Sequence, residues 1–77
     1  MVKRNIKLQG VDQARAFNAS CGNAPFHVNL RQGNYLIDGK SIMGIFSLNW
    51  DETLCMEADT DDADAVQQLF GGYFANA

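Results

Sequence analysis

Hydrophobic and polar residues follow a regular pattern along the first half of the chain, and this pattern predicts three strands and one helix. Residues 2–8 alternate largely between apolar and polar, which is typical of a half-buried strand. Residues 11–21 carry apolar side chains at helical spacing, and a glycine-asparagine pair then supplies a stop, so a helix of about three turns is expected. Residues 26–31 alternate again, and the turn "RQGN" leads into a short apolar strand at 35–37.

The second half of the chain is predicted to add a short helix, a fourth strand and a longer helix. Ser41 precedes an apolar run that ends near Phe46, which predicts a short capped helix. The segment "TLCMEA", residues 53–58, alternates as a strand does. The sequence "TDD" at 60–62 marks a helix start, because capping side chains and acidic residues suit the positive end of the helix dipole. The apolar stripe expected on this last helix comprises Val66, Leu69, Phe70, Tyr73 and Phe74.

The predicted element order, β-α-β-β-(short α)-β-α, indicates an α+β fold. We expect an open-faced two-layer sandwich, in which the helices cover one face of a four-stranded, mainly antiparallel sheet. The other face should be open to solvent, since polar residues alternate with the apolar ones along the strands. The polar set expected there is Lys3, Asn5, Lys7, His27, Asn29 and Arg31. A chain of 77 residues has room for one core, so residues 1–77 are expected to form a single domain.

The basic residues are confined to the first forty positions of the chain, and this distribution limits the kinds of molecule that it can bind as a partner. The net charge is −3, and no lysine or arginine follows Lys40. An acidic chain without a basic stripe argues against nucleic acid as the partner, whereas the basic N-terminal portion suits an acidic protein surface. No apolar run approaches the ~20 residues of a membrane span, and no secretory signal is recognisable. We therefore expect a cytoplasmic protein with no membrane partner.

A search for catalytic and metal-binding motifs is negative, so neither an enzyme nor a cofactor or metal site is expected. The single histidine, His27, falls on the polar face of a predicted strand, which favours a surface position over a site. Cys21 and Cys55 are expected to be reduced and to serve as small apolar residues. Trp50, in a predicted loop, is expected to act as a local packing lid.

The segment "DGKSIMGIFSL", residues 38–48, contains a serine with two interpretations. Ser41 is placed to cap the short helix by accepting a hydrogen bond from a backbone N–H group. The same exposed N–H groups and the helix dipole would favour a phosphate there, and Lys40 is adjacent. The residues alone therefore leave both a structural cap and a regulated phosphoserine open.

The run "KSIMGIFSL" resembles the stretch after the third strand of HPr, the small phosphocarrier of the bacterial phosphoenolpyruvate:sugar phosphotransferase system. The predicted element order matches HPr-like proteins from about residue 6 to residue 70. The resemblance implies the open-faced β-sandwich of HPr, and it places Ser41 on the regulatory serine of the family. It also places Ile42, Met43 and Ile45 on the apolar patch with which HPr-like proteins dock their protein partners.

The same resemblance identifies a departure at the start of the first helix. The family carries its phosphoacceptor histidine there, in a Gly-Leu-His-x-Arg-Pro context, whereas the equivalent region here reads "LQGVDQARAF". Gln13 then falls on the histidine and Arg15 on the arginine, with no proline after it, while His27 belongs to the second strand. We include Gln13, Arg15 and Lys40 in the implied docking surface. A phosphocarrier needs an imidazole nitrogen, so an ordinary phosphoryl relay is not expected.

Three hypotheses about function follow from these residues. The first is a non-catalytic HPr-like regulatory or protein-binding module, controlled by phosphorylation of Ser41, whose protein partners are of phosphotransferase or carbon-regulation type. The catabolite-repression HPr-like protein is a precedent, since it also lacks the histidine and keeps the serine. The second hypothesis is a phosphocarrier with an unconventional acceptor. The third is a small structural or assembly protein in which Ser41 only caps a helix.

Overall fold

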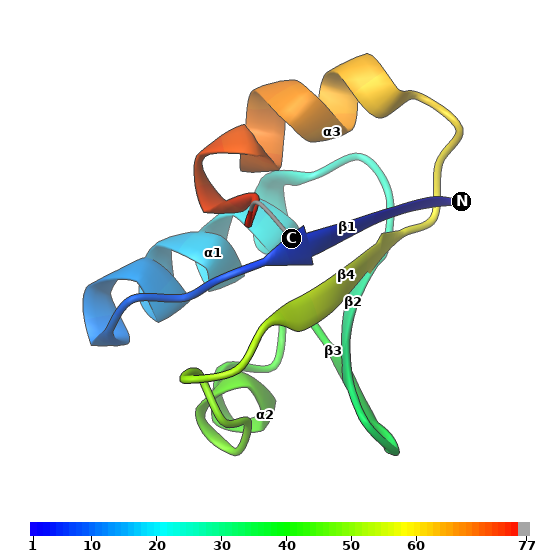
Figure 1. Cartoon of the computed structure of the whole chain (residues 1–77). Helices are drawn as coiled ribbons and strands as arrows, with labels where there is room; N and C mark the ends of the chain where they lie inside the picture. Colours follow the sequence, from blue (N-terminus) through cyan, green and yellow to red (C-terminus); the bar gives the residue numbers. More distant parts are fainter. Residues whose placement is uncertain (76–77) are drawn as a thin grey trace.

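The computed structural model describes residues 1–75, and within them the elements follow the order predicted from the sequence (Figure 1). The strands are β1 (Val2–Ile6), β2 (Val28–Gln32), β3 (Tyr35–Asp38) and β4 (Leu54–Ala58). The helices are α1 (Val11–Asn23), α2 (Ile42–Phe46) and α3 (Ala63–Phe70), and a 3-10 helix, η1 (Gly71–Tyr73), follows α3.

The strands form one antiparallel sheet in the order β1-β4-β2-β3. In one row across this sheet, Met56 of β4 lies between Arg4 of β1 and Leu30 of β2, and Leu30 lies opposite Ile37 of β3. The helices contribute their buried residues to the same face of the sheet, and the predicted α+β open-faced sandwich is thereby confirmed.

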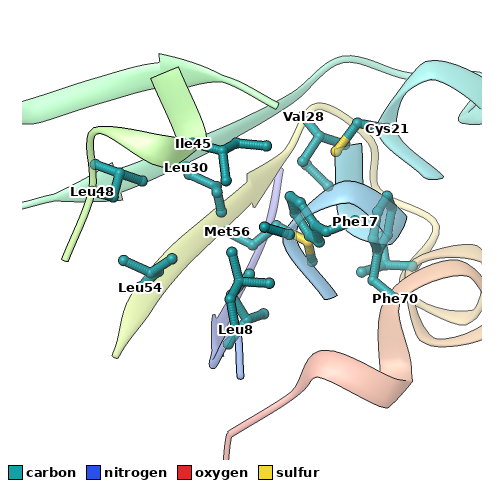
Figure 2. Close-up of a cluster of buried hydrophobic side chains, with 14 of the residues drawn as sticks. Leu8, Phe17, Cys21, Val28, Leu30, Ile45, Leu48, Leu54, Met56 and Phe70 are labelled. Carbon is teal, nitrogen blue, oxygen red and sulfur yellow. The ribbon is translucent and has the colours of Figure 1, made fainter. Parts of the chain in front are cut away.

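One hydrophobic core lies between the sheet and the helices. Figure 2 shows Phe17 of α1, Ile45 of α2 and Phe70 of α3 in a single cluster with the strand residues Leu30 and Met56. All of these side chains are fully buried, and the ring centroids of Phe17 and Phe70 are 5.3 Å apart. Each large apolar side chain contributes about 1.5–3 kcal/mol when it is buried, so this cluster is the main stabilising feature of the fold.

Two strands are shorter than the alternating pattern predicts. β1 ends at Ile6 and not at residue 8, because its pairing with β4 ends at Leu54. Leu8 is still buried, since it reaches the core from the connection to α1. β2 begins at Val28 and not at residue 26, because Val28 pairs with Ala58, the last residue of β4.

The face of the sheet that carries no helix is polar, as the alternation predicts. Lys3, Asn5, His27 and Arg31 are exposed there, and Lys7 and Asn29 are half-buried. Glu57 of β4 is 7% exposed, and its Oε2 accepts a hydrogen bond of 2.7 Å from Nε of Arg31. That bond lowers the pKa of the Glu57 carboxyl below its ordinary value, against the opposite effect of burial. The charge of the buried Glu57 carboxylate is therefore compensated by Arg31.

The last helix begins and packs largely as predicted. Oδ1 of Asp62 accepts a hydrogen bond of 3.1 Å from the N–H of Ala65, so Asp62 is the N-cap. Val66 and Phe70 are four residues apart and are both fully buried. The predicted apolar stripe also includes Leu69, and this part of the prediction is wrong. Leu69 is 36% exposed, at the margin of the buried face.

Two residues of the predicted stripe, Tyr73 and Phe74, lie outside α3, because the helix ends at Phe70 before the Gly71-Gly72 pair. The ring of Tyr73 meets the ring of Phe17 edge to face, with 5.3 Å between the centroids. Phe74 forms an antiparallel bridge with Ile6 of β1. The end of the described chain thus covers part of the free edge of β1.

No helix within residues 1–75 is long and apolar enough to cross a membrane. Over the same residues, no group of three or more His, Cys, Asp or Glu side chains is arranged to hold a metal ion. Cys21 and Cys55 are free cysteines, the first buried and the second half-buried.

Candidate docking and modification site

Ser41 is the N-cap residue of α2. Its Oγ accepts a hydrogen bond of 3.2 Å from the N–H of Gly44, and its own N–H donates to the carbonyl of Asp38 at 2.9 Å. The side chain of Asp38 also takes part: its Oδ1 accepts a hydrogen bond of 2.9 Å from the backbone N–H of Lys40. The predicted capping role is confirmed, and the Ser41 side chain is also exposed to solvent.

Gly44 lets α2 approach β3 closely. A Cβ atom at this position would lie 3.3 Å from Cβ and Cδ1 of Ile37 and 3.1 Å from Oγ of Ser41. These separations are tighter than ordinary van der Waals contact, so Ser41 and Ile37 would have to shift by a few tenths of an ångström to admit a side chain here. The glycine of the "KSIMG" run therefore helps to set where Ser41 lies.

The apolar residues predicted to dock a partner do not share one face of α2. Met43 is 81% exposed and Ile42 is half-buried, but Ile45 is fully buried. The prediction that Ile45 lines the docking surface is therefore wrong, and Figure 2 shows it in the core near Leu30. Residues two positions apart on a helix point to different sides, which is why Met43 and Ile45 separate. Phe46, three residues after Met43, is 43% exposed and shares its side of the helix.

Trp50 lies against the exposed end of α2. Its ring is 5.6 Å from that of Phe46, centroid to centroid, and its indole Nε1 donates a hydrogen bond of 2.9 Å to the carbonyl of Ile45. That carbonyl, at the C-terminal end of the helix, also accepts a hydrogen bond of 3.2 Å from the backbone N–H of Leu48. Trp50 is half-buried against the core, as expected of a packing lid, but its contact with Phe46 was missed. The four-residue spacing of two aromatic residues was the only available signal for it.

The N-terminal end of α1 carries the residues that the resemblance places on the phosphoacceptor motif. The helix follows Gly10, whose φ of 123° favours glycine. Oε1 of Gln13 accepts a hydrogen bond of 2.8 Å from the backbone N–H of Gln9, so this carboxamide closes the first turn. Arg15 is exposed and forms no ion pair within residues 1–75.

The loop that carries Lys40 and Ser41 is attached to the other half of α1. Nδ2 of Asn18 donates a hydrogen bond of 3.0 Å to the carbonyl of Gly39. This bond fixes the chain just before Lys40 and Ser41 against the C-terminal half of α1. Gln13 belongs to the first turn of α1, so it is not joined to this loop.

His27 lies beyond the C-terminal end of α1 and not at its start. Its side chain is exposed, and Nε2 is 2.8 Å from Oδ1 of Asn29. His27, Cys21 and Lys40 are among the residues around a hollow of about 270 Å³. Burial raises the pKa of the Cys21 thiol to about 12, and the carboxylate of Asp38 adds to the shift. This thiol is therefore protonated at neutral pH, when it is a poor nucleophile.

No family model and no curated protein matches the chain by sequence. Structural comparison does find similar proteins. The crystal structure of HPr-C-His from Thermoanaerobacter tengcongensis superposes with a TM-score of 0.75 at 23% identity, over 92% of this chain and 89% of that one.

A second similar structure is the phosphocarrier protein HPr from Bacillus anthracis str. Ames. It superposes with a TM-score of 0.73 at 16% identity, over 94% of this chain and 95% of that one. The match in both cases extends over nearly the whole length of each chain. The chain therefore has the fold of the HPr phosphocarrier proteins.

Proposed function

We propose that the chain is a non-catalytic HPr-like module that binds proteins of the phosphotransferase or carbon-regulation type, with Ser41 as its regulatory phosphorylation site. One observation carries this proposal. The exposed face of α2 is present, with Met43 81% exposed beside the capping serine, while the start of α1 offers no imidazole. We expect the module to act in the cytoplasm.

The chemistry at the start of α1 argues against an ordinary phosphocarrier. A phosphoryl relay requires a nitrogen nucleophile whose phosphoramidate transfers its phosphoryl group readily, which is the role of a histidine ring. Gln13 offers an amide nitrogen whose lone pair is delocalised, and its oxygen already accepts the bond from Gln9. Arg15 offers a guanidinium group, which has no free lone pair and is not a nucleophile. Without an acceptor, docking is the function that this fold retains.

The surroundings of Ser41 are compatible with a phosphate. The hydroxyl is exposed, and the N–H of Gly44 already points at its oxygen. Lys40 precedes it and supplies a positive charge, whereas Asp38 lies two residues further back. A phosphate would add about −1.5 to −2 charges beside the exposed Met43, and so would change the surface that a partner meets.

Two incubations test the proposal. With phosphoenolpyruvate and the first enzyme of the phosphotransferase system, we expect no acid-labile phosphate on the chain. An acid-labile label would support the phosphocarrier hypothesis instead. With ATP and a bacterial HPr-type kinase, we expect one phosphate on Ser41 by mass spectrometry, absent from Ser41→Ala. Ser47→Ala is the matched control, because Ser47 is an exposed serine at the other end of α2.

Binding is measured separately from phosphorylation. Isothermal titration with the same first enzyme and with the kinase should give a complex that Met43→Asp abolishes. If neither protein binds and Ser41 stays unmodified, the chain has the HPr fold without the HPr-like role. That result would favour the structural or assembly hypothesis.

A further inference from the structure

We infer that the docking surface of α2 continues onto Trp50 and selects a partner segment that carries an apolar side chain next to a basic one. The inference rests on the proposed function, because it takes α2 as the docking element, and it adds the chemistry of the partner. We use the name α2–Trp50 surface for Met43, Phe46, Trp50, Asp51 and Glu52.

A shallow, open hollow with a mixed polar and apolar lining lies beside the apolar side chains of this surface. Its volume is about 260 Å³, and its lining consists of Phe46, Leu48, Asn49, Trp50 and Asp51. Phe46 and Trp50 form an aromatic wall, with their rings tilted by 51° to each other. Aromatic residues of this kind dominate the binding energy of protein interfaces when a partner covers them.

Hydrogen bonds hold the hollow in shape. Gln32 donates to the carbonyl of Asn49 at 2.8 Å and accepts from its N–H at 2.9 Å. Nζ of Lys7 donates to the carbonyl of Asp51 at 2.6 Å. Together with the bond from Trp50 to Ile45, these contacts fix residues 49–51, in the middle of the loop between α2 and β4. A preformed surface loses less conformational entropy when it binds.

The charge of the surface changes along α2. Asp51 and Glu52, at the C-terminal end, are exposed and form no ion pair within the described part of the chain. Lys7 contacts this end, but its single ammonium can offset only one of the two carboxylates. Lys40 stands before the N-terminal end of α2. The carboxylate of the half-buried Asp38 accepts a bond from the backbone N–H of Lys40, so the exposed charge at this end is the Lys40 ammonium. The apolar side chains of Met43 and Phe46 thus lie between an end with an exposed lysine and an end with two exposed carboxylates.

Charge complementarity identifies the occupant as a protein segment with the reverse order of charges. A lysine or arginine beside its apolar side chain would face Asp51 and Glu52 while that side chain enters the hollow. An acidic residue at its other end would face Lys40. A short amphipathic helix can present such a pattern along one face. Nucleic acid does not fit, because its phosphates would meet the two carboxylates.

A peptide-display selection on the full chain tests the inference. Tryptophan-free peptides are selected in parallel on the wild type and on the variant Asp51→Asn/Glu52→Gln, so Trp50 remains the sole indole. We expect wild-type peptides to carry a basic residue within one helical turn of an apolar anchor. Each should change the Trp50 fluorescence and bind the charge variant about tenfold more weakly, with the difference shrinking at high salt.

Matched variants locate the binding. Met43→Asp should abolish the binding of the selected peptides. Leu36→Asp should leave it unchanged, because Leu36 is a 49% exposed apolar residue that the strand register places on the helix-free face. Trp50→Phe keeps an aromatic ring but removes the bond to Ile45, and should weaken binding without unfolding the chain. Circular dichroism confirms that each variant is folded.

Three outcomes would overturn the inference: no enrichment of any peptide, enrichment without basic residues, or equal binding to the wild type and the charge variant. The proposed function fails differently, when the phosphotransferase proteins neither bind nor phosphorylate the chain. In that case the selection can still yield the apolar–basic pattern, and the surface would then serve a partner of another class.

Discussion

The sulfur of Cys21 packs directly against the backbone of Gly39, so closely that a Cβ atom at position 39 would lie 2.6 Å from it. Gly39 also donates a hydrogen bond of 2.8 Å from its N–H to the carbonyl of Val28 and accepts one from Asn18. The chain just before Ser41 is therefore clamped between α1 and β2. This clamp is what gives the candidate modification site a fixed position on the fold.

The first prediction concerns this clamp. Gly39→Ala should lower the free energy of unfolding by about 1–3 kcal/mol, because the new methyl group would also lie 3.0 Å from the backbone oxygen of Val28, which cannot rotate away. Gly22→Ala is the matched control: its methyl group meets nothing within 4 Å, so it should be neutral or stabilising by up to about 1 kcal/mol. Urea denaturation of both variants measures the difference, and equal effects would contradict the packing argument.

The Cys21 thiol is expected to be unreactive and to make stability fall at high pH. Its pKa is raised from 9.0 to about 12 in the folded chain, so the unfolded state loses the proton first. The stability that the protonated Cys21 thiol contributes to the folded chain is fully present below pH 9. It is lost progressively as pH rises from there toward 12. The midpoint temperature of thermal unfolding should fall less between neutral and alkaline pH in Cys21→Ala than in the control Cys55→Ala. A thiol reagent should label Cys55 before Cys21 in the native chain.

Ile45 and Met43 are expected to respond in opposite ways to truncation. Ile45→Ala removes a fully buried side chain and should cost about 2–5 kcal/mol of stability. Met43→Ala should change stability by less than about 0.5 kcal/mol, because that side chain is 81% exposed, yet it should weaken partner binding. Denaturation followed by Trp50 fluorescence, together with titration calorimetry, separates the two effects. A large stability loss in Met43→Ala would refute the assignment of faces.

Ser41→Ala is expected to cost about 1 kcal/mol, since it removes the acceptor for the N–H of Gly44. Ser41→Asp should keep the cap and most of the stability while it adds a negative charge. If the serine has a regulatory role, the two variants differ in partner binding as well as in stability. Identical binding by both would leave Ser41 with its structural role alone.

The ion pair between Arg31 and Glu57 on the helix-free face predicts that the free energy of unfolding falls at acidic pH. The pKa of Glu57 is lowered in the folded chain, first by the hydrogen bond from Arg31. The stabilisation is therefore present above the ordinary pKa of 4.5 and is lost as pH falls through the lowered folded value. Urea denaturation at a series of acidic pH values measures this effect. The urea midpoint of Glu57→Gln should fall less with decreasing pH than that of the wild type. Glu52→Gln, at an exposed site without an ion pair in residues 1–75, should not.

The fold was predictable because its information is local and periodic. The alternation along β4 places Leu54, Met56 and Ala58 in the core, and all three are fully buried. The caps Ser41 and Asp62 were predictable for the same reason, since a cap and its N–H partner are separated by only three residues. Strand ends were less predictable, because they depend on where a partner strand stops.

The candidate site was only partly predictable. The short run around Ser41 indicated a cap, and the cap is present, but it did not indicate which apolar residues of α2 face solvent. Ile45 was assigned to the surface by resemblance, although the packing of α2 against the sheet buries it. The contact between Phe46 and Trp50 depends on the path of the loop after α2, which no periodicity encodes.

The sequence by itself determined the element order, the polar and apolar faces of the strands, the capping serine and the fact that the start of α1 carries no histidine. These are properties of neighbouring residues, and local sterics and hydrogen bonding are sufficient to produce them. Only the tertiary structure decided that Ile45 is buried in the core while Met43 is exposed. It also decided that the loop before Ser41 is bound to the C-terminal half of α1, whereas Gln13 lies in the first turn of that helix. Those outcomes depend on how α1 and α2 pack on the sheet, because burial is set by residues distant in the chain.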